Sequence, residues 1–143
     1  MDKNFVSVKL ATQPENVGLA RMIAAGFIAP LDPSVDEISD IKTAVSEGVT
    51  NAIIHGYDGA EGMVDMHLRI NGTTITIDIC DYGIGIADID AVREPLFTTK
   101  PDLERSGLGF TVMEQFMDHV SIQSTLGEGT TITLTKTLAG PGK

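Results

Sequence analysis

Three polar side chains recur at steps of four residues near the middle of the chain: Glu47, Asn51 and His55. If this segment is helical, the spacing places all three on one face. The amide oxygen of Asn51 can hold a hard Mg²⁺ ion, and the Glu47 carboxylate can accept the proton of an attacking hydroxyl or water. The pattern indicates phosphoryl transfer. The alternative is the solvated polar face of an amphipathic helix.

A fourth polar residue, Asp81, ends an alternating run of isoleucines and shares their inward parity. A carboxylate on the buried side of a strand is costly unless a donor bonds to it, and the exocyclic amino group of adenine is such a donor. Gly83 and Gly85 follow at once and would let the backbone approach a flat ring closely. The segment predicts an adenine site. The alternative is an aspartate that begins a turn.

A glycine-containing segment, Ser106-Gly107-Leu108-Gly109, precedes a predicted helix. Exposed backbone amides and a helix N-terminus bind anions, and Lys100 and Arg105 would add positive charge near a terminal phosphate. The alternative is a flexible glycine loop without a ligand. Together with the two sites above, this segment predicts ATP as the ligand, with Mg²⁺ bringing positive charge to a chain whose formal net charge is −10.

Hydrophobic periodicity predicts the elements that would position these residues. Capping boxes at Thr12–Glu15 and Ser34–Glu37 open two helices, and Asn71-Gly72 is typical of a hairpin turn. In chain order we expect a strand at 5–10, helices that carry 17–28 and 38–53, strands at 64–70 and 75–81, a helix at about 109–117, and strands at 120–124 and 131–136.

The predicted fold class is α+β. The two hairpins form a mixed, mostly antiparallel sheet, and three helices need one apolar surface, so a two-layer sandwich with helices on one face is expected. Residues 1–138 form a single predicted domain, and 139–143 a flexible tail. Residues 87–106 have no clean period and are long for a connection, which indicates a functional lid.

Composition limits the classes of partner. An acidic chain lacks the basic footprint of an unassisted DNA- or RNA-binding protein, so no direct nucleic-acid ligand is expected. We find neither a charged-then-apolar leader nor an apolar run of about 18 residues, which predicts a cytoplasmic protein without a membrane partner. Cys80 is the only cysteine, so it cannot form an internal disulfide, and we expect it in the core.

Taken together, these segments resemble the sequence boxes of the GHKL ATPase superfamily, to which gyrase, MutL and histidine kinases belong. The chain is more similar still to the small stand-alone anti-sigma-factor kinases, in particular the anti-sigma-F factors of spore-forming bacteria. The resemblance covers nearly the whole chain and is strongest over residues 46–57, 95–101 and 103–110.

The resemblance implies roles for individual residues. Glu47 would be the general base that takes the proton from a serine hydroxyl of a partner protein, and Asn51 would ligate Mg²⁺. Asp81 would accept from the adenine amino group, and Arg21 would bind the partner proteins. The remaining residues implied in binding ATP or ADP are His55, Gly83, Gly85, Thr98, Thr99, Lys100, Arg105, Ser106, Gly107, Leu108, Gly109, Phe110 and Thr130.

The implied function is a partner switch. A homodimer would hold a sporulation sigma factor away from RNA polymerase, and would phosphorylate a serine of an anti-sigma-factor antagonist to inactivate it. Two alternatives remain open. One is a non-catalytic, nucleotide-dependent binding module of the same fold, which has no need of a carboxylate at Glu47. The other is a detached histidine-kinase catalytic domain, which is disfavoured because no dimerisation helix with a phospho-accepting histidine precedes Thr12.

Overall fold

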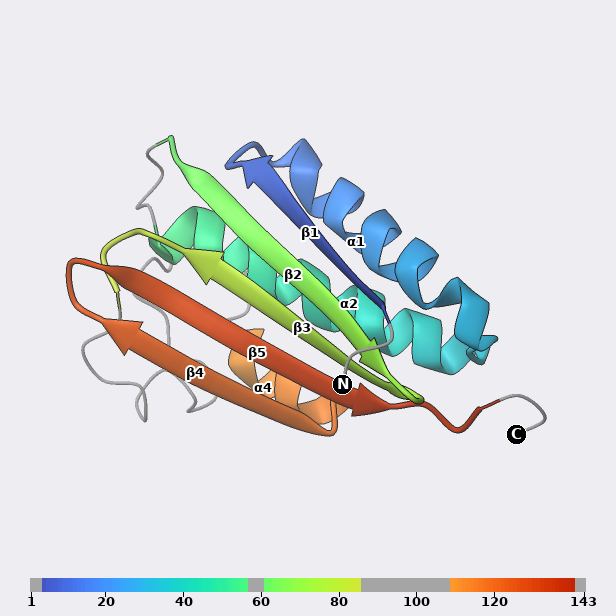
Figure 1. The fold of residues 1–143 in the computed structure, drawn as a ribbon. Coiled ribbons are helices and arrows are strands. Elements are labelled where there is room, and N and C mark those ends of the chain that lie inside the picture. Colours follow the sequence, from blue (N-terminus) through green and yellow to red (C-terminus); the bar gives the residue numbers. More distant parts are fainter. Residues whose placement is uncertain (1–3, 57–60, 86–108, 141–143) are drawn as a thin grey trace.

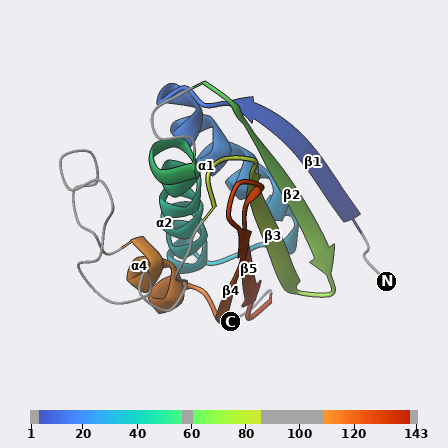
Figure 2. The ribbon, with the colours of Figure 1, turned by 90° about the vertical axis from the view of Figure 1, so that its left-hand side faces the viewer.

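The computed structural model describes residues 4–56, 61–85 and 109–140. Five strands form one sheet, and the helices lie together on one of its faces (Figures 1 and 2). The strands are β1 (Asn4–Ala11), β2 (Met63–Asn71), β3 (Thr74–Asp81), β4 (His119–Thr125) and β5 (Gly129–Thr137). The helices are α1 (Glu15–Ile28), α2 (Val35–Asn51) and α4 (Gly109–Phe116), with a 3₁₀ turn η1 (Ala29–Leu31) and a π-helical turn η2 (Ala52–Gly56).

The strand order is β1-β2-β3-β5-β4, and each of these four pairings is antiparallel. The predicted α+β sandwich is therefore confirmed, and no parallel pair occurs among the strands that the structure describes. β5 pairs with β3 although β4 comes between them in the sequence. This crossover matters for the site because it brings the first residues of β5 beside the last residues of β3.

The helix-facing side of the sheet is built from rows of apolar residues in register. Ile79 of β3 pairs with Ile132 of β5, which pairs with Ile122 of β4. These rows belong to one continuous cluster with the buried faces of the helices, whose members include Ala20, Ala24, Phe27, Ile28, Ile41, Ala44, Val45, Val49 and Met113. The alternation expected from the sequence thus separates the two faces of the sheet.

The two predicted capping boxes have different outcomes. At α2 the Ser34 hydroxyl accepts from Glu37 N–H at 3.1 Å, and the Glu37 carboxylate accepts from Ser34 N–H at 2.8 Å, so this box is confirmed. The box at Thr12 is wrong. The Thr12 hydroxyl accepts instead from Gly62 N–H at 2.9 Å. Helix α1 begins after Pro14 without a side-chain cap. Thr12 therefore joins the end of β1 to the start of β2.

The other face of the sheet is polar. Arg69 donates to Asp78 at 2.8 Å, and the Thr133 hydroxyl donates to the other Asp78 oxygen at 2.7 Å. Cys80 lies on this face, half-buried, so its predicted core position is wrong: its parity is opposite to that of Ile79. Burial nevertheless raises the pKa of the Cys80 thiol. Among the described helices, none is long and apolar enough to cross a membrane.

Candidate functional site

One row of the helix-facing side breaks the apolar pattern. Asp81 of β3 pairs with Thr130 of β5, and Thr130 pairs with Ser124 of β4. Asp81 is only 5% exposed and Thr130 only 4%. The neighbouring row toward the sheet's interior is the isoleucine row that contains Ile79, so three polar side chains stand together where the sheet ends. This placement confirms the inward parity that the sequence predicted for Asp81.

The Asp81 carboxylate has few partners for a buried acid. Its Oδ1 atom accepts from Gly83 N–H at 3.0 Å, and no side chain among the described residues donates to it. Burial raises the pKa of Asp81, while the backbone N–H groups of Gly83 and Thr130 act in the opposite direction. A buried carboxylate with spare acceptor capacity can bind a ligand that brings hydrogen-bond donors.

Glycines shape the backbone around this carboxylate. Gly85 has a φ of +80°, and a Cβ there would collide with the Thr125 carbonyl. Gly129 has a φ of +125°, and a Cβ there would collide with the Asp81 carbonyl. Gly127 N–H donates to the Ile84 carbonyl at 2.9 Å. The β4–β5 turn therefore holds the segment that follows Asp81, and both close approaches require glycine.

Helix α2 carries Glu47 to the same end of the sheet. The next residue, Gly48, packs so closely that a Cβ on it would lie 2.5 Å from Ile79 Cδ1 and 3.7 Å from Met113 Sδ. Glu47 is half-buried and faces α4, because a Cβ on Gly109 would lie 3.3 Å from Glu47 Oε2. The candidate base thus lies against the first residue of α4. Its helix, α2, packs on Ile79, which is two residues before Asp81 in β3.

The α-helical winding ends at Asn51, four residues before His55. Asn51 is half-buried and ends α2 one turn after Glu47, as predicted. The chain then changes to the π-helical turn η2, which contacts β3 and β5. The side chain of His55 lies outside the described residues, so its place on the same face stays a prediction. Single π-helical turns are frequent at functional sites.

Of the remaining residues predicted to bind the nucleotide, Gly109 and Phe110 are described and the others are not. Gly109 begins α4, whereas Phe110 directs its side chain into the hydrophobic core. The expectations for Thr98, Thr99, Lys100, Arg105, Ser106, Gly107 and Leu108 lie outside the described residues, as does the predicted lid.

Comparison with known proteins is consistent with this geometry. The model of the histidine kinase-like ATPase domain family matches residues 10–136. The anti-sigma F factor of Clostridium beijerinckii is 51% identical over 95% of this chain and 96% of its own length. The anti-sigma F factor of Bacillus subtilis is 51% identical over 96% of this chain and 94% of its own length. The chain belongs to the anti-sigma F factor family.

A solved structure shares the fold. The RsbU and RsbW domains of a Mycobacterium tuberculosis protein match with a TM-score of 0.71 and 22% identity over 99% of this chain, which spans 34% of that longer chain. At this identity the likeness concerns the fold. It agrees with the α+β sandwich of this anti-sigma F factor family member.

The donor set of the site fits Mg²⁺, which binds through one or two protein oxygens and completes its shell with water and substrate phosphates. Asn51 offers a hard amide oxygen at the end of α2, and Glu47 lies one turn before it. A cage of acidic residues is not required for such a site, and the described residues contain no group of three metal-ligating side chains. Asn51 is accordingly the residue that would hold the ion.

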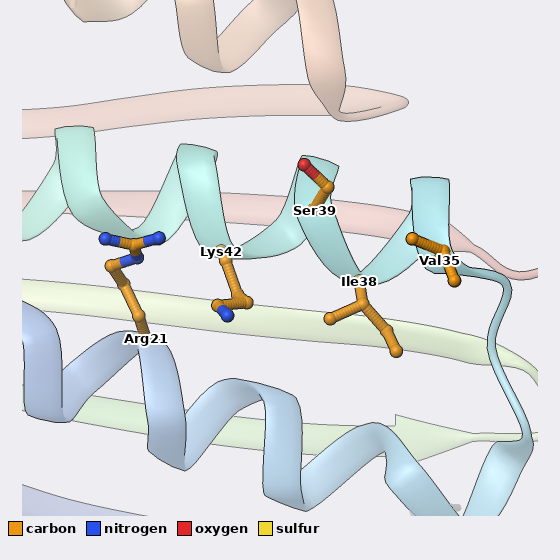
Figure 3. Close-up of a pocket in the computed structure, with 5 residues that line it drawn as sticks. All are labelled: Arg21, Val35, Ile38, Ser39 and Lys42. Carbon is orange, nitrogen blue, oxygen red and sulfur yellow. The ribbon is translucent and has the colours of Figure 1, made fainter.

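Arg21, the predicted partner-binding residue, lies away from this site. It is exposed on α1 and lines a pocket of about 210 Å³ between α1 and α2. Figure 3 shows Arg21 reaching toward α2, while Lys42 and Ile38 point from α2 into the gap. Within the described ranges neither cation pairs with a carboxylate, although this family member is strongly acidic overall. The pocket therefore offers positive charge beside apolar side chains.

The sequence reasoning missed two parts of the site. Ser124 bonds to Thr130 and to the β4–β5 turn, and Gly129 makes the close approach to Asp81. Ser124 could have been found, because it shares the inward parity of Val120 and Ile122 and is the polar exception on its strand. The signal for Gly129 depends on the crossover between β3 and β5, which local periodicity does not contain.

Proposed function

We propose that the protein is an anti-sigma factor and an ATP-dependent serine protein kinase. It binds a sporulation sigma factor and keeps it from RNA polymerase, and it phosphorylates a serine of an antagonist protein. The observation that carries the proposal is the placement of Glu47, whose carboxylate lies against Gly109 on a helix packed beside the row of Asp81. A candidate base and a candidate adenine acceptor thus share one end of the sheet.

The chain's own residues have separate tasks in this proposal. Asp81 accepts from the adenine amino group, and Gly83 and Gly85 allow the backbone to lie close to the ring. Asn51 would hold a Mg²⁺ ion, which would supply positive charge to neutralise the phosphates. Glu47 takes the proton of the antagonist's serine hydroxyl, whose oxygen bonds to the γ-phosphorus as the bond to ADP breaks. The products are phosphoserine and ADP.

Partner binding is the second half of the proposal. The names of relatives that are about half identical over nearly their whole length support a sigma factor as one partner. The pocket that contains Arg21 and Lys42 supplies positive charge that no carboxylate of the described residues pairs with. An acidic segment of the sigma factor or of the antagonist would complement it. The active form is a homodimer in this proposal.

The test is a phosphotransfer assay with radiolabelled ATP, Mg²⁺ and, as the candidate antagonist, the protein encoded next to this one. Glu47→Gln and Glu47→Ala are expected to lower the rate by at least about a hundredfold, the usual contribution of a general base. ADP affinity, measured by calorimetry, should stay close to that of the unaltered protein. Asp36→Asn serves as the control, since Asp36 is an exposed carboxylate in the first turn of the same helix.

Three other outcomes would count against the proposal, and two of them favour an alternative function. Full phosphotransfer by Glu47→Ala would remove the general base from the proposal. Binding of ADP and sigma factor without phosphotransfer by the unaltered protein would favour the non-catalytic binding module. Transfer to a histidine instead of a serine would favour the histidine-kinase catalytic domain.

A further inference from the structure

We propose that Ser124 sets the preference for adenine over 6-oxopurines by fixing the direction of the Thr130 hydroxyl. Ser124 would act as a positioning residue, without touching the nucleotide. The inference rests on the proposed nucleotide-binding function and deepens it. It starts from the polar row Ser124–Thr130–Asp81, in which each residue is the register partner of the next across β4, β5 and β3.

Two short contacts define the Ser124 hydroxyl. Its Oγ atom lies 3.0 Å from the Gly129 carbonyl oxygen and 2.8 Å from Thr130 Oγ1. A carbonyl oxygen can only accept, so Ser124 donates in the first contact. A hydroxyl has one hydrogen to donate. In the second contact, therefore, the Thr130 hydroxyl donates and Ser124 accepts.

This direction decides what Thr130 can offer to a ligand. Because its hydrogen is directed at Ser124, the Thr130 oxygen presents only acceptor lone pairs on the side of Asp81. The Asp81 carboxylate beside it also accepts. The two residues together form an edge without a side-chain donor. Where it faces the 6 position of the ring rather than N1, such an edge attracts the exocyclic amino group of adenine and repels the carbonyl oxygen of hypoxanthine or guanine.

Burial makes this direction persistent. Thr130 is almost fully buried. If its hydroxyl turned away from Ser124 it would lose this hydrogen bond, and water would not replace it. Without Ser124 the Thr130 hydrogen is released and can turn toward a ligand carbonyl. The same pocket would then tolerate a 6-oxopurine better and would lose part of its preference for adenine.

The experiment compares ADP with IDP, which carries a carbonyl where ADP carries the amino group. Both affinities are measured by calorimetry on the full chain. Ser124→Ala is expected to lower the ratio of the IDP to the ADP dissociation constant by about threefold to tenfold, the value of one buried hydrogen bond. Ser124→Thr keeps the hydroxyl and should keep the ratio. Ser121→Ala makes the same change on the opposite face of β4 and should also leave it unaltered.

The ratio separates this inference from a purely structural role. If Ser124 only fastens the β4–β5 turn, Ser124→Ala lowers thermal stability and weakens both nucleotides equally, and an unchanged ratio overturns the inference. Partial unfolding of the variant cannot mimic the expected result, because it reduces both apparent affinities by the same factor. Failure of the unaltered protein to bind ADP would instead overturn the proposed function itself.

Discussion

Two buried aspartates lie on opposite faces of the same sheet, and their surroundings differ. Asp65 is on the polar face, where it accepts from the Tyr82 hydroxyl and pairs with Lys9 at 3.1 Å. The Tyr82 hydrogen bond holds the pKa of Asp65 below its usual value. Asp81, on the helix-facing side, has a hydrogen bond from Gly83 N–H and no side-chain donor among the described residues, and burial raises its pKa.

The difference bears on which of the two buried acids fits the proposed binding site. Burial alone does not distinguish the two, since both are less than a tenth exposed. The side-chain donors do: Asp65 has Tyr82 and Lys9, whereas Asp81 has none among the described residues and keeps acceptor capacity that fits a ligand. Tyr82 belongs to both environments. It follows Asp81 in the chain, and its hydroxyl donates to Asp65 on the opposite face.

The largest effect is expected from Asp81→Asn. The change removes the charge and places an amide donor where the adenine amino group should be accepted. We expect ADP affinity to fall by about tenfold to a hundredfold, the range for a hydrogen bond to a charged acceptor. Calorimetric titration with ADP measures the loss.

Without nucleotide the same variant should be at least as stable as the unaltered protein at neutral pH, because it no longer buries a poorly partnered charge. Urea unfolding checks this part. Unchanged ADP affinity would refute the adenine role of Asp81. A large loss of stability would show that Asp81 is as structural as Asp65, and the comparison would no longer hold.

A smaller and opposite effect is expected from Asp65→Ala. The free energy of unfolding should fall by about 1 kcal/mol, since one hydrogen bond is lost and the ion pair is discounted because the Lys9 side chain is 62% exposed. ADP affinity should change little. Thr133→Val is a matched control, because it removes another hydrogen bond to a carboxylate on the same face. A loss of ADP affinity specific to Asp65→Ala would show that the two faces are coupled through Tyr82.

The alternation of residues 64–81 was sufficient to predict both strands, their hairpin and the inward direction of Asp81. It did not predict that Asp65 is buried. Outward parity predicts a solvated carboxylate, but Lys9 of β1 and Tyr82, which directly follows β3, both bond to it. Cys80 shows the same limit, since an apolar strand suggested a core residue and the pleat placed it outside. Local pattern predicts the face of a residue and not what its neighbours cover.

The rest of the site depends on the order of strands. Ser124 and Thr130 meet Asp81 only because β5 lies between β3 and β4, a choice that no single segment of sequence specifies. The π-helical turn after Asn51 is a second case. Helical spacing predicted one face for Glu47, Asn51 and His55, but it did not predict that the α-helical winding ends at Asn51, where the following turn contacts β3 and β5.

The smallest effect is a difference in the pH dependence of unfolding without nucleotide. A raised pKa in the folded state means that Asp81 favours folding below its unfolded pKa, and that this contribution is lost as the pH rises through the folded pKa. The lowered pKa of Asp65 has the opposite sign. Its contribution is present above the unfolded pKa and is lost as the pH falls through the folded pKa.

Urea unfolding of the unaltered protein, Asp81→Asn and Asp65→Asn between acid and neutral pH should reveal these signs. Relative to Asp81→Asn, the unaltered protein should become less stable as the pH rises. Relative to Asp65→Asn it should become more stable. Two differences of the same sign would mean that both carboxylates have the same protonation preference in the fold. Spare acceptor capacity would then not be what separates Asp81, the proposed adenine acceptor, from the structural Asp65.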